Sequence, residues 1–410
     1  MKSNAGKNGQ RLSIFAIASI IAGAGISLAT LPAGIAQAAD KPADKVKVGV
    51  VTTLSTPAGA LGVDMRDGFN LALKHLGGKL GGRPAEVTVS DDQFNPDTGR
   101  QIVERYVKRD RVDFVTGIIY SNIMLAAGQT AFESKTPYVS ANAGPSQYAG
   151  KGCSPWFVSA AWQNDTFHEA AGQHATSKGY NNAYLMAPNY PAGQDALTGF
   201  KRFYKGKVNQ EVYVKLGQLD FAAELAQLRA AKPDVVYVFF PGGMGINFIK
   251  QFVAAGLSKD TTLLLPGFSA DQDIIPAVGD SMLGLFSTAH WALDLDNAEN
   301  RKFVADFEAT YKRLPSVYAA QGYDTALLMD AAVQSVKGRV EDREAVMKAL
   351  KTVKAKSVRG AYRINNNGYP VQNYYLRVVG KDGQGRLVNK TMGTVFSNHA
   401  DAYAKECALK

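Results

Sequence analysis

Short apolar runs alternate along the chain with stretches in which hydrophobic residues recur every three or four positions. The first run, 46–54 (VKVGVVTTL), is followed by a stretch with apolar residues at Met65, Phe69 and Leu76 that ends at Gly77. Apolar runs bounded by turn residues predict buried strands, and the three-to-four spacing predicts helices. Because the alternation repeats without long loops, it predicts an α/β fold built on a doubly wound parallel sheet.

This alternation runs once to about residue 162 and then begins again. In the second part we expect strands at 183–187, 211–216, 235–240, 262–265 and 284–289, with helices between them. Two successive sheets of similar size predict two lobes.

The rest of the chain predicts long amphipathic helices at 297–313 and 317–336, and helices without a sheet of their own must pack on an existing lobe. We therefore expect the chain to return to the first lobe near residue 290 and to cross again near residue 371. Three crossings between lobes make a hinge beside a cleft. The expected division is lobe 1 at 39–162 plus 290–371, lobe 2 at 163–289 plus 372–396, and a C-terminal tail at 397–410 that returns to lobe 1.

The N-terminus has the pattern of an export signal. Lys2, Lys7 and Arg11 precede an acid-free apolar run at 12–31, and a small-x-small site follows at 36–38. This pattern predicts a signal peptide at 1–38 that is cleaved near Ala38, and hence a periplasmic protein. The run is also long enough to anchor a tethered receptor sensor domain, but glycines and a proline interrupt it.

The chain has two cysteines, Cys153 and Cys407, and both lie beyond the predicted cleavage site. An even number in an exported chain favours a disulfide, which would connect the C-terminal tail to the first half of the fold. The alternative is a pair of buried free thiols.

The composition and motifs argue against several classes of function. Lys and Arg are scattered despite a formal net charge of +10, which disfavours nucleic-acid binding, and five histidines with two cysteines predict no metal site. A dinucleotide fingerprint at 243–248 has Phe248 in place of its third glycine, and a phosphate-loop-like stretch at 144–152 lacks Ser or Thr after Lys151. We therefore expect neither enzymatic activity nor a cofactor; an exported Rossmann-type enzyme is the alternative.

The loops that follow the predicted strands have different characters in the two halves. In the first half, 55–61, 120–122 and 142–144 are small and rich in hydroxyl and backbone N–H groups. In the second half the corresponding loops carry the aromatic residues Tyr190, Phe240 and Phe268. Open α/β sheets bind ligands at such strand ends, and hydroxyl and N–H groups suit a small anionic group.

Several segments together resemble the type I periplasmic solute-binding proteins of ABC transporters, in the branched-chain amino-acid group and its aromatic-acid-binding branch. They are VKVGVVTTLSTPAGALGVDMRDGFNLAL, the Asp91-Asp92 turn with PDTGRQIVERYV, VDFVTGIIYS, PYVSANAG, WQNDT, NYPAGQDALTGFK and PDVVYVFFPGG. The resemblance implies two Rossmann-like lobes joined by three crossings. It also implies a monomer that closes on a small solute and delivers it to a membrane permease.

By position, the resemblance assigns the ligand carboxylate to the hydroxyl and N–H of Ser121. It assigns an assisting turn to Ala143 and Gly144, with Tyr120 and Asn142 beside these two elements.

Apolar contacts are assigned in the same way. Leu61 takes a lid position that is aromatic in the family, Tyr190 closes over the ligand, and Phe240 and Pro241 lie near another aromatic contact.

One position departs from the amino-acid binders of this family. Phe268 stands where they carry an acid for the ligand ammonium, and burying an unpaired ammonium costs several kcal/mol. A carboxylate anchor with aromatic walls therefore predicts an aromatic acid as solute. The alternative is a branched-chain or other amino acid, with Asp271 pairing with the ammonium.

Overall fold

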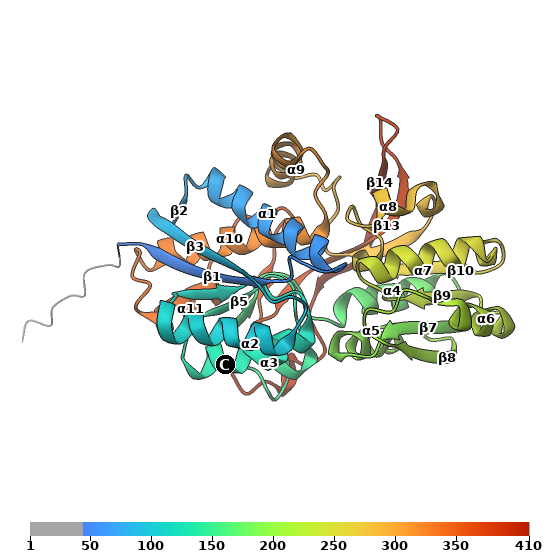
Figure 1. Cartoon of the computed structure of the whole chain (residues 1–410), viewed down its shortest axis with the longest axis horizontal. Helices are drawn as coiled ribbons and strands as arrows, with labels where there is room; N and C mark the ends of the chain where they lie inside the picture. The colour runs from blue at the N-terminus through green and yellow to red at the C-terminus, as the bar shows by residue number, and fades with distance from the viewer. Residues whose placement is uncertain (1–43, 410) are drawn as a thin grey trace, which may run out of the picture. The chain divides into compact units, whose positions relative to one another are not determined.

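A computed structural model describes residues 44–409, which form two β-sheets covered by helices (Figure 1). The expected α/β fold of two Rossmann-like lobes joined by a three-crossing hinge is confirmed. The predicted signal peptide at 1–38 lies outside the described residues.

The first sheet has the strand order β2-β3-β1-β4-β5-β6. Its strands are β1 (Val46–Thr52), β2 (Lys79–Leu80), β3 (Arg83–Asp91), β4 (Phe114–Thr116), β5 (Tyr138–Ser140) and β6 (Phe157–Ser159). All neighbours pair in parallel except β2 and β3. The apolar run of β1 is almost wholly buried, which explains its central place between β3 and β4.

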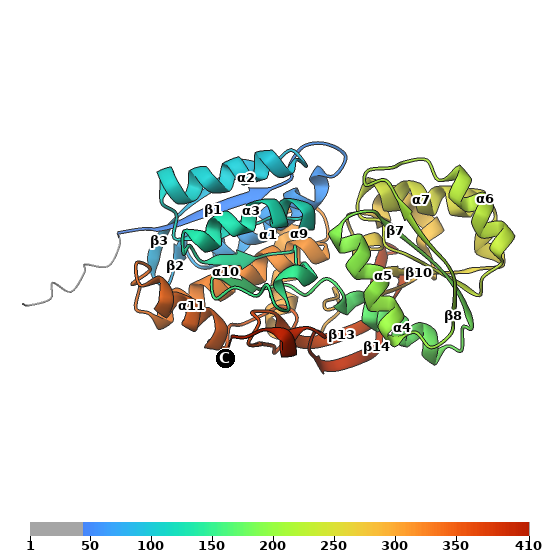
Figure 2. The same ribbon diagram turned by 90° about the horizontal axis from the view of Figure 1, so that it is seen from below.

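Six helices belong to this first sheet. They are α1 (Gly59–His75), α2 (Pro96–Arg105), α3 (Ser121–Glu133), α9 (Ala298–Tyr311), α10 (Val317–Ser335) and α11 (Arg343–Thr352). Of the helices after residue 290, α9 and α10 contact α1, and α11 contacts β6. Figures 1 and 2 show α10 beside α1.

The backbones of α1 and α10 approach each other very closely. A Cβ atom at Gly68 would lie 1.9 Å from the carbonyl oxygen of Ala319, and one at Gly322 would lie 2.0 Å from that of Met65. Only glycine allows the two backbones to approach so closely, and this contact attaches α10 to the first lobe.

The second sheet has the order β12-β13-β11-β10-β9-β7-β8, with β14 paired to β13. Its strands are β7 (Asn182–Pro188), β8 (Lys207–Val214), β9 (Val235–Val238), β10 (Thr262–Pro266), β11 (Phe286–Ala289), β12 (Arg363–Ile364), β13 (Pro370–Lys381) and β14 (Leu387–His399). Strands β7 to β11 are parallel, and β13 joins them antiparallel through β11.

Five helices accompany this second sheet: α4 (Thr166–Ser177), α5 (Pro191–Phe203), α6 (Ala222–Ala231), α7 (Gly243–Ala254) and α8 (Ile275–Val278). Alternate residues of the strands face different helices, as the period of two requires. Leu185 and Tyr237 pack in the core that includes α4 and α5, whereas Met186 and Val236 pack in the core of α6 and α7. Figure 2 shows these two helix pairs on opposite faces.

The segment from β6 to α4 is held by hydrogen bonds from distant parts of the chain. Arg359 donates from Nη1 to the carbonyl oxygen of Ala161 at 2.6 Å and from Nη2 to that of Ala160. The Nε2 of Gln372 also donates to Ala161, at 2.9 Å. Arg359 forms a buried ion pair with Asp324 of α10, at 3.3 Å. The crossing segments therefore brace one another.

The C-terminal tail returns to the first sheet. Cys153 and Cys407 form the expected disulfide, across 254 residues of sequence. The Nδ2 of Asn366 donates to the carbonyl oxygen of Ala404 at 3.1 Å, and that of Asn367 donates to the Asp401 carboxylate. In the part of the chain that the structure describes, no helix is long and apolar enough to cross a membrane.

Removing the disulfide should destabilise the protein. Replacing both Cys153 and Cys407 with serine should lower the free energy of unfolding by about 2–5 kcal/mol, because the unfolded chain loses a long closed loop. Urea denaturation of the variant and of wild type measures the difference. Wild type under reducing conditions serves as control and should unfold like the variant. An unchanged free energy of unfolding would contradict the prediction.

Candidate functional site

The strand-end loops of the two sheets meet around a narrow cavity. Residues of both lobes line it: Leu61, Ile119, Tyr120, Ser121, Asn142, Trp162, Asn164, Tyr190, Ala192, Phe239, Pro241, Phe268 and Tyr318. The cavity is polar where Ser121, Asn142 and Asn164 line it and aromatic or aliphatic elsewhere. Its free volume is about 20 Å³, roughly the space of one water molecule, so a larger solute enters only if the walls move apart.

Ser121 is the first residue of α3, and it is 1% exposed. Tyr120 occupies the N-cap position and gives no side-chain cap to the helix. The first backbone N–H groups of a helix have no intrahelical acceptor, and the helix dipole makes this end favourable for negative charge. The cavity therefore receives a hydroxyl and a helix N-terminus from the same residue, which suits a carboxylate.

The side chain of Asn164 determines how Ser121 can bond. Its Nδ2 donates to the Oγ of Ser121 at 3.0 Å and to Oδ2 of Asp195 at 2.9 Å. Its Oδ1 accepts from the backbone N–H of Gly144 at 3.0 Å, and because that N–H can only donate, this bond identifies which amide atom is the oxygen. Ser121 Oγ is thus an acceptor toward Asn164, and its own proton remains available to an acceptor in the cavity.

The 142–144 turn supports the site largely from behind. Asn142 lines the cavity while its Nδ2 donates to the carbonyl oxygen of Ile119 at 2.8 Å. The N–H of Ala143 donates to Ile118, and the N–H and carbonyl of Gly144 both bond Asn164. A Cβ at Gly144 would lie 2.4 Å from the carbonyl oxygen of Trp162, so glycine permits this contact.

Aromatic side chains form the wall opposite. The ring centroids of Trp162 and Phe268 are 4.4 Å apart, those of Phe268 and Tyr318 are 5.4 Å apart, and those of Tyr190 and Phe239 are 6.4 Å apart. These spacings are typical of interacting rings, and a planar group inserted among them would gain similar contacts.

Phe240 lies on the other side of the sheet. It packs against Phe221 at 4.9 Å and Phe248 at 5.3 Å, whereas its neighbour Phe239 lines the cavity. Consecutive residues at the end of a strand point to opposite faces, so a shift of one residue exchanges the two positions. Phe248, which interrupts the dinucleotide fingerprint, is part of this core.

Asp271 is occupied by another partner. Its Oδ2 accepts from Nη1 of Arg377 at 2.8 Å, and both side chains are 1% exposed. Asp271 therefore forms a buried ion pair with Arg377 and does not line the cavity. Burial, together with the nearby carboxylates of Asp271 and Asp64, raises the pKa of Asp273 well above its usual value.

Three of the residues that line the cavity are tyrosines with neutral hydroxyls. Burial raises the pKa of Tyr120, Tyr190 and Tyr318 above the ordinary value. None of these hydroxyls has a hydrogen-bond partner among residues 44–409. Each can therefore donate to, or accept from, a polar substituent of a ligand.

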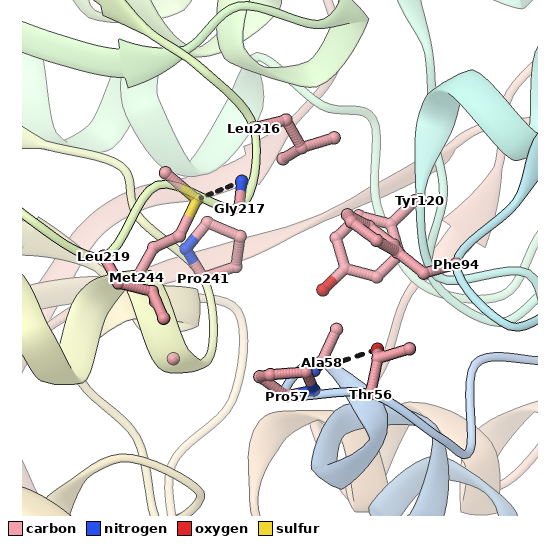
Figure 3. A pocket seen from close by; sticks show the side chains of 11 residues that line it. Thr56, Pro57, Ala58, Phe94, Tyr120, Leu216, Gly217, Leu219, Pro241 and Met244 are labelled. Carbon is pink, nitrogen blue, oxygen red and sulfur yellow. Dashed lines mark hydrogen bonds between the residues drawn. The ribbon is translucent and has the colours of Figure 1, made fainter.

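A second cavity of about 220 Å³ adjoins the first (Figure 3). Its lining is mostly apolar and comes from both lobes: Thr56, Pro57, Ala58, Phe94, Tyr120, Leu216, Gly217, Leu219, Pro241, Gly243 and Met244. Tyr120 and Pro241 line both cavities, and Figure 3 shows the Tyr120 hydroxyl pointing into the second one.

Six lining residues were not predicted from the sequence: Ile119, Trp162, Asn164, Ala192, Phe239 and Tyr318. Trp162 and Asn164 belong to the WQNDT segment at the first crossing, which was a usable signal. Tyr318 lies on α10 and reaches the site only through the packing of that helix, which no local pattern indicates.

Comparison with known proteins gives this geometry a context. A family model described as periplasmic binding protein matches residues 45–384. The Leu/Ile/Val-binding protein homolog 6 of Brucella melitensis is 28% identical over 374 residues, covering 88% of this chain and 93% of that protein.

Two solved structures are similar over nearly their whole length. A solute-binding protein of an ABC transporter from R. palustris, in complex with benzoate, has 32% identity and a TM-score of 0.84, covering 89% of this chain and 100% of that one. One from Rhodopseudomonas palustris BisB5, in complex with 3,4-dihydroxybenzoic acid, has 29% identity and a TM-score of 0.83, covering 88% and 99%. The family match extends over both lobes and all the lining residues, and the chain therefore belongs to the periplasmic binding proteins.

Proposed function

We propose that the protein is the periplasmic substrate-binding component of an ABC transporter and captures a small aromatic carboxylate between its lobes. It acts without catalysis, as a monomer exported through cleavage near Ala38, and it delivers the solute to the membrane permease. The observation that carries the proposal is the Ser121 hydroxyl, which accepts from Asn164 and keeps its proton for an acceptor at the N-terminus of α3.

In this proposal the solute carboxylate binds Ser121 beside Asn142, and the turn of Ala143 and Gly144 supports the site from behind through Asn164. The ring lies among the aromatic and apolar side chains that line the cavity: Leu61, Tyr120, Trp162, Tyr190, Phe239, Pro241, Phe268 and Tyr318. The benzoate and dihydroxybenzoate complexes of the two similar solute-binding proteins support an aromatic acid. The neutral tyrosine hydroxyls suit ring hydroxyl groups.

A branched-chain amino acid is the second candidate, because the curated relative is named a Leu/Ile/Val-binding protein homolog. An amino acid would need a partner for its ammonium. Asp271 is paired with Arg377, and breaking a buried pair is costly. This candidate is therefore the weaker of the two.

A thermal-shift screen of the mature protein distinguishes the candidates. Benzoate and hydroxybenzoates should raise the melting temperature, since a ligand at 100 times its Kd stabilises the folded state by about 2.7 kcal/mol. Leucine, isoleucine and valine should leave it unchanged. A shift with leucine and none with any benzoate would reject the aromatic-acid proposal in favour of the amino-acid one.

Replacing Ser121 with alanine should weaken binding of the preferred acid roughly 10- to 100-fold, because a hydrogen bond to a charged group contributes about 1.5–3 kcal/mol. Isothermal titration calorimetry measures the change. Ser134→Ala is the matched control: Ser134 lies at the other end of α3, where its hydroxyl donates to Ala131, and its loss should leave affinity unchanged. Equal affinities for Ser121→Ala and wild type would remove the carboxylate role from Ser121.

A further inference from the structure

A hydrogen-bonded chain of four side chains connects the lobes beside the cavity. Ser146 lies in the short helix Ser146–Tyr148 that follows β5 of the first sheet, and Asp195 lies on α5 of the second. Asn164 stands between them in the first crossing segment and reaches Ser121. All of these groups are fully or largely buried.

The Asp195 carboxylate accepts hydrogen bonds from both Ser146 and Asn164. Its Oδ1 accepts from the hydroxyl of Ser146 at 2.6 Å. Its Oδ2 accepts from the backbone N–H of Ser146 at 3.1 Å and from Nδ2 of Asn164 at 2.9 Å. Two of these bonds join the second lobe directly to the first, so they exist only while the lobes are together.

The side-chain amide of Asn164 hydrogen-bonds both Asp195 and Ser121, so the orientation that Asp195 gives to the amide also determines how the amide bonds Ser121. An amide nitrogen has two hydrogens, and here one is directed at Asp195 and the other at Ser121. When Asp195 accepts the first hydrogen, the second is aimed at Ser121 Oγ. The serine oxygen then accepts from Asn164, and the hydroxyl proton is left for another acceptor, such as a ligand group in the cavity.

We propose that Asp195 is a positioning residue that, on lobe closure, fixes Asn164 and thereby makes Ser121 a hydrogen-bond donor selective for a carboxylate. The inference rests on the proposed function, because it explains how the carboxylate end of the solute is recognised. It adds that this recognition is completed by a residue of the opposite lobe that does not line the cavity.

The carboxylate selectivity of variants tests this role. The ligand pair is the tightest-binding carboxylate of the screen and its primary amide, for example benzoate and benzamide. Asp195→Ala should weaken carboxylate binding roughly tenfold or more and should also lower the ratio of amide Kd to carboxylate Kd several-fold, because Ser121 loses its fixed orientation. Asn164→Ala should lower the ratio in the same way.

Two further variants separate positioning from mere stability. Asp195→Asn retains an oxygen that can accept from Asn164, so its ratio should stay close to that of wild type. Ser146→Ala removes one bond between the lobes but leaves Asn164 untouched. It should weaken both ligands equally and keep the ratio. Thermal unfolding without ligand monitors the folding of every variant.

The outcomes are distinct. A lowered ratio in Asp195→Ala and Asn164→Ala, with normal ratios in Asp195→Asn and Ser146→Ala, supports the inference. A normal ratio in Asp195→Ala, even with weaker binding, overturns it, since Asp195 would then serve closure alone. If wild type itself binds the amide as tightly as the carboxylate, the proposed carboxylate recognition fails, and the inference fails with it.

Discussion

The paired hydrogen bonds between Asn164 and Gly144 are the constraint on which the site depends. The backbone N–H of Asn164 donates to the carbonyl of Gly144 at 2.8 Å, and the N–H of Gly144 donates back to the Asn164 side chain at 3.0 Å. This pair fastens the first crossing segment to the turn after β5. Arg359 fastens the same segment from the other side, through Ala160 and Ala161. These hydrogen bonds hold the first crossing segment in place, and its residues Trp162 and Asn164 line the cavity.

The two lobes contribute complementary chemistry because their strand ends differ. The first lobe presents a helix N-terminus with a buried serine, which attracts negative charge, beside the apolar side chains of Leu61, Tyr120 and Tyr318. The second presents Tyr190, Phe239 and Phe268, which gain contact area when a ring is enclosed. In the proposed function a solute contacts both sets of side chains at once, and this would couple recognition to closure.

Much of the fold and part of the site could be predicted from the sequence, because both depend on local patterns. Strand and helix periodicity predicted two doubly wound sheets, and the strand-end rule singled out Ser121 and Tyr190, which line the cavity. The disulfide between Cys153 and Cys407 followed from their number and the export signal.

The parts that were missed depend on tertiary placement. Phe239 rather than Phe240 lines the cavity because the strand register exchanges them. Tyr318 reaches it through the packing of α10, and Asp271 is paired with Arg377, 106 residues further along the chain. Asn164 and Asp195 lie in the WQNDT and NYPAGQDALTGFK segments that resemble the family, but their link to Ser121 becomes visible only in the folded structure.

The most direct test of this account is a crystal structure of the mature protein with benzoate bound. The account predicts one carboxylate oxygen within hydrogen-bond distance of Ser121 Oγ, with the ring enclosed by Trp162, Tyr190 and Phe268. A benzoate found in the neighbouring cavity beside Leu216 and Met244, with Ser121 uncontacted, would contradict it.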